Sequence, residues 1–248
     1  MASQRINHQP VFLLASAPWR ENSLWLEVYS RTYGRVALLA RSARTRQSEL
    51  RGVLVPFVPV SASWYGTQEL KTLHRAEWLG GWPQPQGRSL FAGLYVNELM
   101  LKLTAREDPQ PRLYDALGEV MKAVCCDPNH VAALRRFEWT LLTELGCAPD
   151  LSADERGEAV EAERQYWVRP DEAVCLWQGS VPPPVGEVVS GSTLLQLGAG
   201  EFESNGLREA LKITRCLIDY RLPEGVKSRQ ILQQMEQFGL AVGGIRPA

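Results

Sequence analysis

Apolar positions in the first third of the chain recur with the short period of β-strands. Leu24, Leu26 and Val28 alternate with other residues, as in a strand that is buried on one face. Five segments share such strand patterns: 11–16, 24–28, 36–40, 53–64 and 69–79. Five strands separated by turn signals predict a small barrel or sandwich. A five-stranded OB-type (oligonucleotide/oligosaccharide-binding) barrel over residues 1–80 is the more economical choice.

After a Pro/Gly-rich linker at residues 81–87, the period changes to that of helices. Apolar residues recur at intervals of three and four in five segments: 90–106, 113–124, 134–145, 207–218 and 227–238. Gly146 directly after the third segment is a typical C-terminal cap, and the first three helices are expected to form a bundle. The fold class predicted is therefore α+β, with the barrel followed by a mostly helical domain over residues 88–242.

The region at about 148–190 has no clear period. It begins with acidic residues, contains two candidate short strands at 166–169 and 174–177, and ends in a proline run. We interpret it as an irregular insertion in the helical domain.

The charge is unevenly divided although the formal net charge of the chain is −1. Residues 1–80 hold ten Arg/Lys against five Asp/Glu, and the remainder holds seventeen against twenty-three. Between residues 31 and 51 lie one acid, Glu49, and six arginines: Arg31, Arg35, Arg41, Arg44, Arg46 and Arg51. Guanidinium groups in such a loop pair with phosphate oxygens and release counterions. A solvated basic loop is the plainer alternative.

Several classes are disfavoured by what the sequence lacks. No apolar run is long enough to span a membrane, and the N-terminus has no signal-peptide pattern. The five cysteines show no C-x-x-C spacing, which is typical of reduced thiols in a cytoplasmic protein. Nucleotide-binding, zincin and serine-hydrolase motifs are absent, and the three histidines are dispersed. We therefore expect no catalytic residues, no cofactor and no metal.

A barrel with an arginine-rich loop and aromatic residues has the ingredients for single-strand binding. Trp25 and Tyr29 lie on the opposite strand face from Leu26 and Val28, so either set could point outward. Each ring could equally be core packing. Lys71 and Arg75 would add a basic row on one face of the last strand.

Four segments in this order resemble the RecO family of bacterial DNA-repair recombination mediators. They are PWRENSLWLEVYSRTYGRVALLARSARTRQSELRG at 18–52, LYVNELM at 94–100, ALRRFEWTLLTELG at 133–146 and VKSRQILQQM at 226–235. The resemblance implies an OB-type barrel followed by a helical domain, binding of single- and double-stranded DNA, and annealing of complementary strands without ATP. It also implies RecR and single-strand-binding protein (SSB) as partners, with RecA loaded indirectly, in a cytoplasmic, nucleoid-associated protein.

The resemblance also assigns site residues. By motif, the DNA contacts would be Arg35, Arg41, Arg44, Arg46 and Arg51; the strand pattern, not the resemblance, adds Lys71 and Arg75. Arg135 and Arg136 stand where the family receives the acidic C-terminal tail of SSB. Adjacent residues on a helix point about 100° apart, so we expect only one of these two arginines to face a pocket. A surface salt bridge to the acidic insertion is the alternative for this pair.

Two features depart from or extend the pattern. Some family members carry a four-cysteine zinc site after the helical bundle, but only Cys147 and Cys175 lie there, so we predict no structural zinc. Lys227 and Arg229 open a helix, where cations oppose the macrodipole. An anionic ligand or a contact with the barrel would explain them.

Two other functions stay open from the residues. An adaptor that docks an acidic peptide, with only weak nucleic-acid contact, would depend on Arg135 or Arg136 and be indifferent to Arg44 and Arg46. An RNA-binding protein could use the same barrel.

Overall fold

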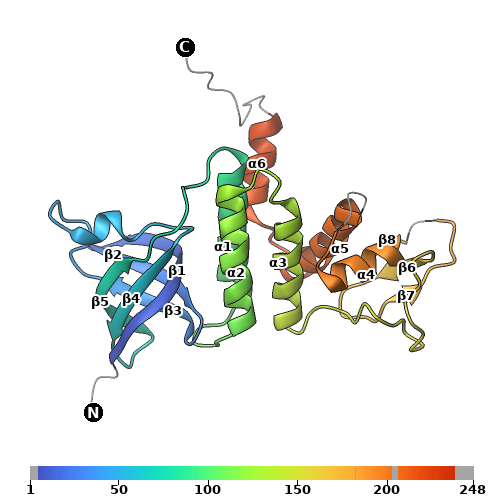
Figure 1. Ribbon diagram of the computed structural model, residues 1–248, viewed down its shortest axis with the longest axis horizontal. Helices are drawn as coiled ribbons and strands as arrows, with labels where there is room; N and C mark the ends of the chain where they lie inside the picture. Colours follow the sequence, from blue (N-terminus) through green and yellow to red (C-terminus); the bar gives the residue numbers. More distant parts are fainter. Residues whose placement is uncertain (1–4, 182, 203–205, 238–248) are drawn as a thin grey trace. The chain divides into compact units, whose positions relative to one another are not determined.

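The computed structural model of the chain describes residues 5–181, 183–202 and 206–237, so residues 238–242 of the predicted helical domain lie outside it. The predicted α+β class is confirmed, because a closed N-terminal barrel is followed by helices (Figure 1). The barrel strands are β1 (Arg5–Trp19), β2 (Ser23–Ser30), β3 (Gly34–Ala40), β4 (Pro59–Tyr65) and β5 (Leu70–Trp78). The helices are α1 (Arg88–Leu103), α2 (Pro111–Cys126), α3 (Val131–Glu144), α4 (Gly191–Ala199), α5 (Gly206–Arg221) and α6 (Lys227–Gln237). Among the described helices, none is long and apolar enough to cross a membrane.

The barrel strands follow the order β1-β2-β3-β5-β4, and β4 closes the barrel by pairing with β1. The β3–β5 pair is parallel and the other pairs are antiparallel. Alternation turns Leu26, Val28 and Leu38 into the barrel, where they pack with the fully buried Trp64. The OB-type prediction is therefore confirmed.

The outer face of β1 and β2 is also buried, because α1 and α2 cover it. Phe12 pairs with Tyr29 across the two strands, and both are at most 3 % exposed. The Phe12 ring lies 5.5 Å from the Tyr114 ring of α2, centroid to centroid. Asn97 of α1 donates from Nδ2 to the Leu13 carbonyl at 3.4 Å. The barrel and this helix pair thus share one apolar interface.

Contacts divide the chain into two compact units. The first unit holds the barrel with α1, α2 and α6, and the second, residues 129–225, holds α3, α4 and α5. Within their units, α1 packs on α2 and α6, and α3 packs on α5 and α4. Of the three helices expected to form a bundle, α1 and α2 belong to the first unit and α3 to the second, because an amphipathic pattern identifies an apolar face but not its partner. The division at residues 81–87 stays a prediction.

The region read as irregular contains a small three-stranded sheet. It consists of β6 (Gln165–Val168) at the centre with β7 (Cys175–Leu176) and β8 (Glu187–Ser190) on either side. The two candidate strands match β6 and β7, whereas β8 and α4 were not predicted. Ser190 caps α4, since its Oγ accepts from the Thr193 N–H at 3.3 Å, and Glu209 of α5 holds the same hydroxyl at 2.8 Å. That carboxylate comes from another helix, so the local sequence carries little sign of it.

Candidate functional site

The arginine loop, residues 41–52 between β3 and β4, carries four exposed arginines. They are Arg41, Arg44, Arg46 and Arg51. The loop is ordered by its own turns: the Thr45 N–H donates to the Ser42 carbonyl and the Ser48 N–H donates to the Thr45 carbonyl, each at 3.2 Å. A short 3₁₀ helix (Glu49–Gly52) follows. Because the loop's own hydrogen bonds hold its backbone, its guanidinium groups are presented together although the loop itself is not paired in the sheet.

Arg44 holds this loop against the turn between β1 and β2. Its N–H donates to the Asn22 carbonyl at 3.0 Å, and its Nη1 donates to the carbonyls of Arg20 at 3.3 Å and Glu21 at 3.1 Å. Arg20 on that turn is itself exposed and adds a guanidinium that our reading of the sequence did not single out. The position of Arg20 in the sequence was a reason to consider it, since the β1–β2 loop of such barrels contacts ligands.

Arg31 and Arg35 are already paired within the first unit. Arg31 donates twice to the Asp115 carboxylate, at 3.0 Å each, and these hydrogen bonds hold the pKa of Asp115 below its ordinary value. The Arg35 side chain is only 17 % exposed. It donates to the Thr104 carbonyl at 2.8 Å and to Glu27 at 3.4 Å. Arg35 was expected to contact DNA, but here it serves an internal ion pair.

The segment between α1 and α2 lies beside β3, and its Arg106 reaches over the outer face of β2. The Glu107 N–H donates to the Arg35 carbonyl at 3.0 Å, so this segment lines the edge of β3. Arg106 forms ion pairs with Glu27 and Glu69, and its guanidinium lies 6.0 Å from the centre of the Trp25 ring. In barrels of this type the face of strands 2 and 3 is the usual place for a nucleic acid. In this chain Arg106 lies over the Glu27 part of that face, Trp25 and Leu39 at its other end stay half-buried, and Tyr29 is not an exposed base platform.

Lys71 and Arg75 do not form the expected same-face row. The register of β5 shifts between Leu73 and Arg75, which reverses the alternation and turns the two side chains to opposite faces. Lys71 is 12 % exposed and pairs with Glu107, whereas Arg75 is 63 % exposed and pairs with Glu77 at 2.5 Å.

The adjacent Arg135 and Arg136 on α3 differ completely in burial. Arg135 is 5 % exposed, and its Nη2 donates to Glu138 at 2.6 Å. Thr214 of α5 donates to the same buried carboxylate. Arg136 is exposed and donates from Nη1 to the Gly200 carbonyl at 3.4 Å, at the end of α4. Only Arg136 is accessible to a ligand.

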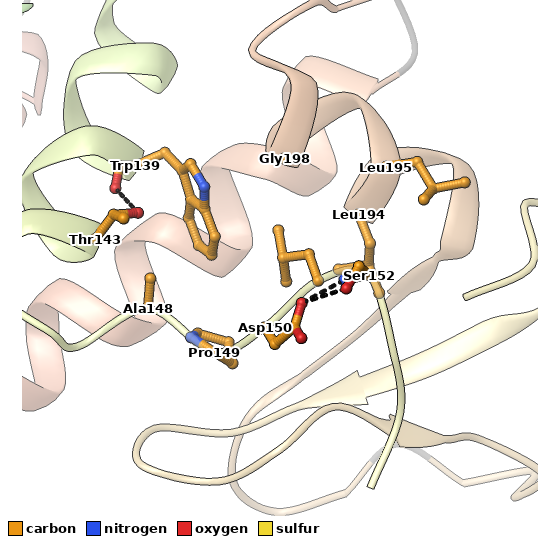
Figure 2. Close-up of a pocket in the computed structure, with 10 residues that line it drawn as sticks. Trp139, Thr143, Ala148, Pro149, Asp150, Ser152, Leu194, Leu195 and Gly198 are labelled. Carbon is orange, nitrogen blue, oxygen red and sulfur yellow. Dashed lines mark hydrogen bonds between the residues drawn. The ribbon is translucent and has the colours of Figure 1, made fainter. Parts of the chain in front are cut away.

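Beside Arg136 a groove of about 560 Å³ runs between α3, α4 and the segment 148–152. Figure 2 shows the Trp139 indole on one side and Leu194 and Leu195 on the other. Arg136 precedes Trp139 by three residues, so both lie on the same face of α3. Asp150 also lines the groove; hydrogen bonds from the Ser152 hydroxyl and N–H hold its pKa below the ordinary value.

Lys227 and Arg229 stand at the start of α6, where the anion present belongs to this chain. The Glu98 carboxylate of α1 accepts from the N–H groups of Lys227 at 2.7 Å and Ser228 at 2.8 Å. Burial raises the pKa of Glu98, but the hydrogen bonds from Ser228, Lys227 and Lys102 outweigh it, so the pKa lies below its ordinary value. Arg229 lies 5.7 Å from the centre of the Tyr95 ring, also on α1. The motif therefore docks α6 on α1.

No three His, Cys, Asp or Glu side chains in the described ranges gather as a metal site requires. The five cysteines are free thiols. Cys175 accepts from Arg169 and donates to Glu155 at 3.0 Å, within the small sheet's unit.

Two family models match the chain almost end to end. Residues 4–82 match "Recombination protein O N terminal" and residues 84–230 match "Recombination protein O C terminal". The DNA repair protein RecO of Neisseria meningitidis serogroup C is 64 % identical over 242 residues, covering 96 % of this chain and 92 % of the relative. That of Neisseria gonorrhoeae is 63 % identical, covering 96 % and 98 %. The RecO of Chromobacterium violaceum is 43 % identical over 244 residues, covering 94 % and 97 %. The chain therefore belongs to the RecO family of DNA repair proteins.

Proposed function

We propose that this protein is a non-catalytic mediator of DNA repair and recombination that binds single- and double-stranded DNA and anneals complementary strands. With RecR it helps to load RecA on DNA coated by SSB. The observation that carries the proposal is the arginine loop, whose exposed guanidinium groups stand on the β1–β2 side of an OB-type barrel in a RecO-family chain. RecR and RecA enter through the family alone.

Electrostatics account for the activity without an energy source. Arg41, Arg46 and Arg51 make no ion pair within the described residues, so each is available to a phosphate. Neutralising the backbones of two strands removes the repulsion that opposes their pairing. Because Arg106 occupies the Glu27 part of the β2–β3 face, the strand follows the loop and the neighbouring β1–β2 turn and reaches only the half-buried Trp25 and Leu39 end of that face.

An annealing assay tests this proposal. Complementary oligonucleotides, one coated with SSB, are mixed without ATP at two salt concentrations. The double variant Arg41→Ala/Arg46→Ala is compared with wild type, because Arg44 also positions the loop and would confound the result. Arg215→Ala is the matched control, since that exposed arginine lies on α5 with Asp219. Wild-type acceleration that the double variant loses supports the proposal. Equal acceleration by both proteins contradicts the loop assignment.

A second part of the proposal concerns the SSB tail. Such a tail ends in a carboxylate after an apolar side chain, and it needs a guanidinium beside an apolar surface. Arg136 supplies the guanidinium, and the groove at Trp139 and Leu195 supplies the apolar surface. Asp150 also lines the groove, and its carboxylate would repel the acidic part of the tail. Arg136 is preferred to Arg135 for this role because Arg135 is buried in its pair with Glu138.

Binding of the tail peptide is measured with a free and with an amidated C-terminus. We expect Arg136→Ala and Trp139→Ala to weaken binding of the free-carboxylate peptide, and amidation to weaken binding to wild type and to Trp139→Ala but not to Arg136→Ala. Unchanged affinity in Arg136→Ala would reject this site. Intact tail binding in a protein that does not bind or anneal DNA would instead assign it to the adaptor class.

A further inference from the structure

A small cavity opens at the foot of the arginine loop. It has a volume of about 370 Å³ and is lined by Leu24, Ala43, Arg44, Leu50, Arg51 and Leu54. Ligand sites begin at about 300 Å³, so this cavity suits one compact chemical group. Leu24, Leu50 and Leu54 are half-buried and pack on the barrel core, so they give the cavity an apolar floor within a lining that is otherwise polar.

Two guanidinium groups border this apolar floor. Arg44 is fixed by its bonds to the carbonyls of Arg20 and Glu21, so its position is set before any ligand arrives. In the part of the chain that the structure describes, the Arg51 side chain has no such partner. A group that fits must therefore combine a flat or apolar body with an adjoining anion. An unpaired nucleotide does so, because bases stack on guanidinium planes and apolar side chains while the phosphate pairs with arginine.

We propose that this cavity receives one unpaired base of a single strand, with its flanking phosphate on Arg51. The inference rests on the proposed DNA binding and adds a means of distinguishing single strands from duplexes. Bases in a duplex are stacked and paired, so they cannot enter without first being extruded. The positive charge around the cavity favours a nucleic acid over a neutral apolar ligand.

The test uses the full chain and three probes of equal length: a single strand, a single strand with abasic sites throughout, and a duplex. Leu50→Gln and Leu54→Gln remove apolar lining without changing charge. Leu211→Gln is the matched control, since that leucine is 42 % exposed on α5. Thermal unfolding of each variant verifies the fold. We expect Leu50→Gln to weaken binding of the normal strand by about five- to tenfold, within the range known for contacts to one base, and to leave the abasic strand and the duplex unchanged.

The outcomes separate the two proposals. If Leu50→Gln binds each of the three probes as tightly as wild type does, the base cavity is overturned and backbone binding is left intact. Equal weakening of all three probes would also overturn it, because the lining would then act only by shaping the loop. Failure of wild type to bind any probe would reject the proposed DNA binding itself. Loss confined to the normal strand in both variants supports the cavity.

Discussion

At the residue scale, arginines that look alike in the sequence have different roles. Arg35 and Arg46 belong to one basic stretch, but Arg35 is held by Glu27 and the Thr104 carbonyl while Arg46 faces solvent. The difference arises because Glu27 is only 1 % exposed and a buried carboxylate requires cationic partners. We therefore expect Arg46 to contribute to DNA binding and Arg35 to contribute to the stability of the fold.

The first prediction contrasts these two residues. Arg46→Ala should weaken DNA binding and reduce the log–log salt slope by about one, since one phosphate contact is lost. Arg35→Ala should keep the slope and destabilise the fold by about 1–3 kcal/mol, because a buried carboxylate loses a donor. Salt titrations and chemical denaturation measure both effects. A reduced slope in Arg35→Ala with unchanged stability would contradict the pairing described above.

The second prediction contrasts Arg135 with Arg136. Removing Arg135 leaves the Glu138 charge buried beside Thr214, so Arg135→Ala should cost about 3–5 kcal/mol of unfolding free energy. Arg136→Ala should change stability by less than about 1 kcal/mol, as is usual for an exposed side chain. Denaturant unfolding of the two variants checks this. A larger loss in Arg136→Ala would be inconsistent with the observed burial.

At the scale of elements, docking of α6 depends on one carboxylate. Glu98 of α1 accepts both leading N–H groups of α6, which satisfies donors that a helix start leaves open and complements its dipole. The Lys227-Ser228-Arg229 motif looked like a site for an anion, and its anion is internal.

This cap makes a prediction about pH. The folded-state pKa of Glu98 lies below its ordinary value, so its stabilisation is complete above the unfolded pKa of about 4.3 and is lost as pH falls through the folded value. The melting temperature of wild type should exceed that of Glu98→Gln above about pH 5, and the gap should narrow on further acidification. A difference in melting temperature that stays constant down to pH 3 would show that the stabilisation does not depend on the charge of the Glu98 carboxylate.

Elements with a strong local period could be predicted from sequence, whereas short ones could not. Gly146 ends α3 as expected, with φ of 67° and the Cys147 N–H donating to the Leu142 carbonyl at 2.8 Å. The nine-residue α4 and the four-residue β8 escaped because both are short, β8 pairs with the distant β6, and the Ser190 cap of α4 is held by Glu209 of another helix. The even spacing of Lys71 and Arg75 misled because one register shift reverses strand faces.

At the scale of the whole molecule, the barrel depends on helices that follow it in sequence. Phe12 and Tyr29 lie outside the barrel interior, and their burial requires α1 and α2. The family models divide at residues 82–84, while contacts keep the barrel, α1 and α2 in one compact unit.

The last prediction concerns fragments. A fragment of residues 1–80 should expose the Phe12–Tyr29 face and leave Glu27 without Arg106, so it should aggregate or unfold without a cooperative transition. A fragment of residues 1–128 retains that cover and should melt cooperatively. Near-ultraviolet circular dichroism during heating measures both. Cooperative melting of the shorter fragment would show that the barrel is stable without its helices.

The sequence by itself determined the barrel strands, the long helices and the arginine-rich stretch, because alternation, helical period and charge are local properties of the chain. Its motifs were also sufficient to indicate the family. Only the tertiary structure decided which arginines remain available. Glu27, Glu107, Asp115 and Glu138 select their partners across 3 to 84 residues of sequence, and Arg106 occupies part of the face that the barrel type would offer. Burial makes an unpaired charge costly, so folding assigned some cations to internal carboxylates and left others for a ligand.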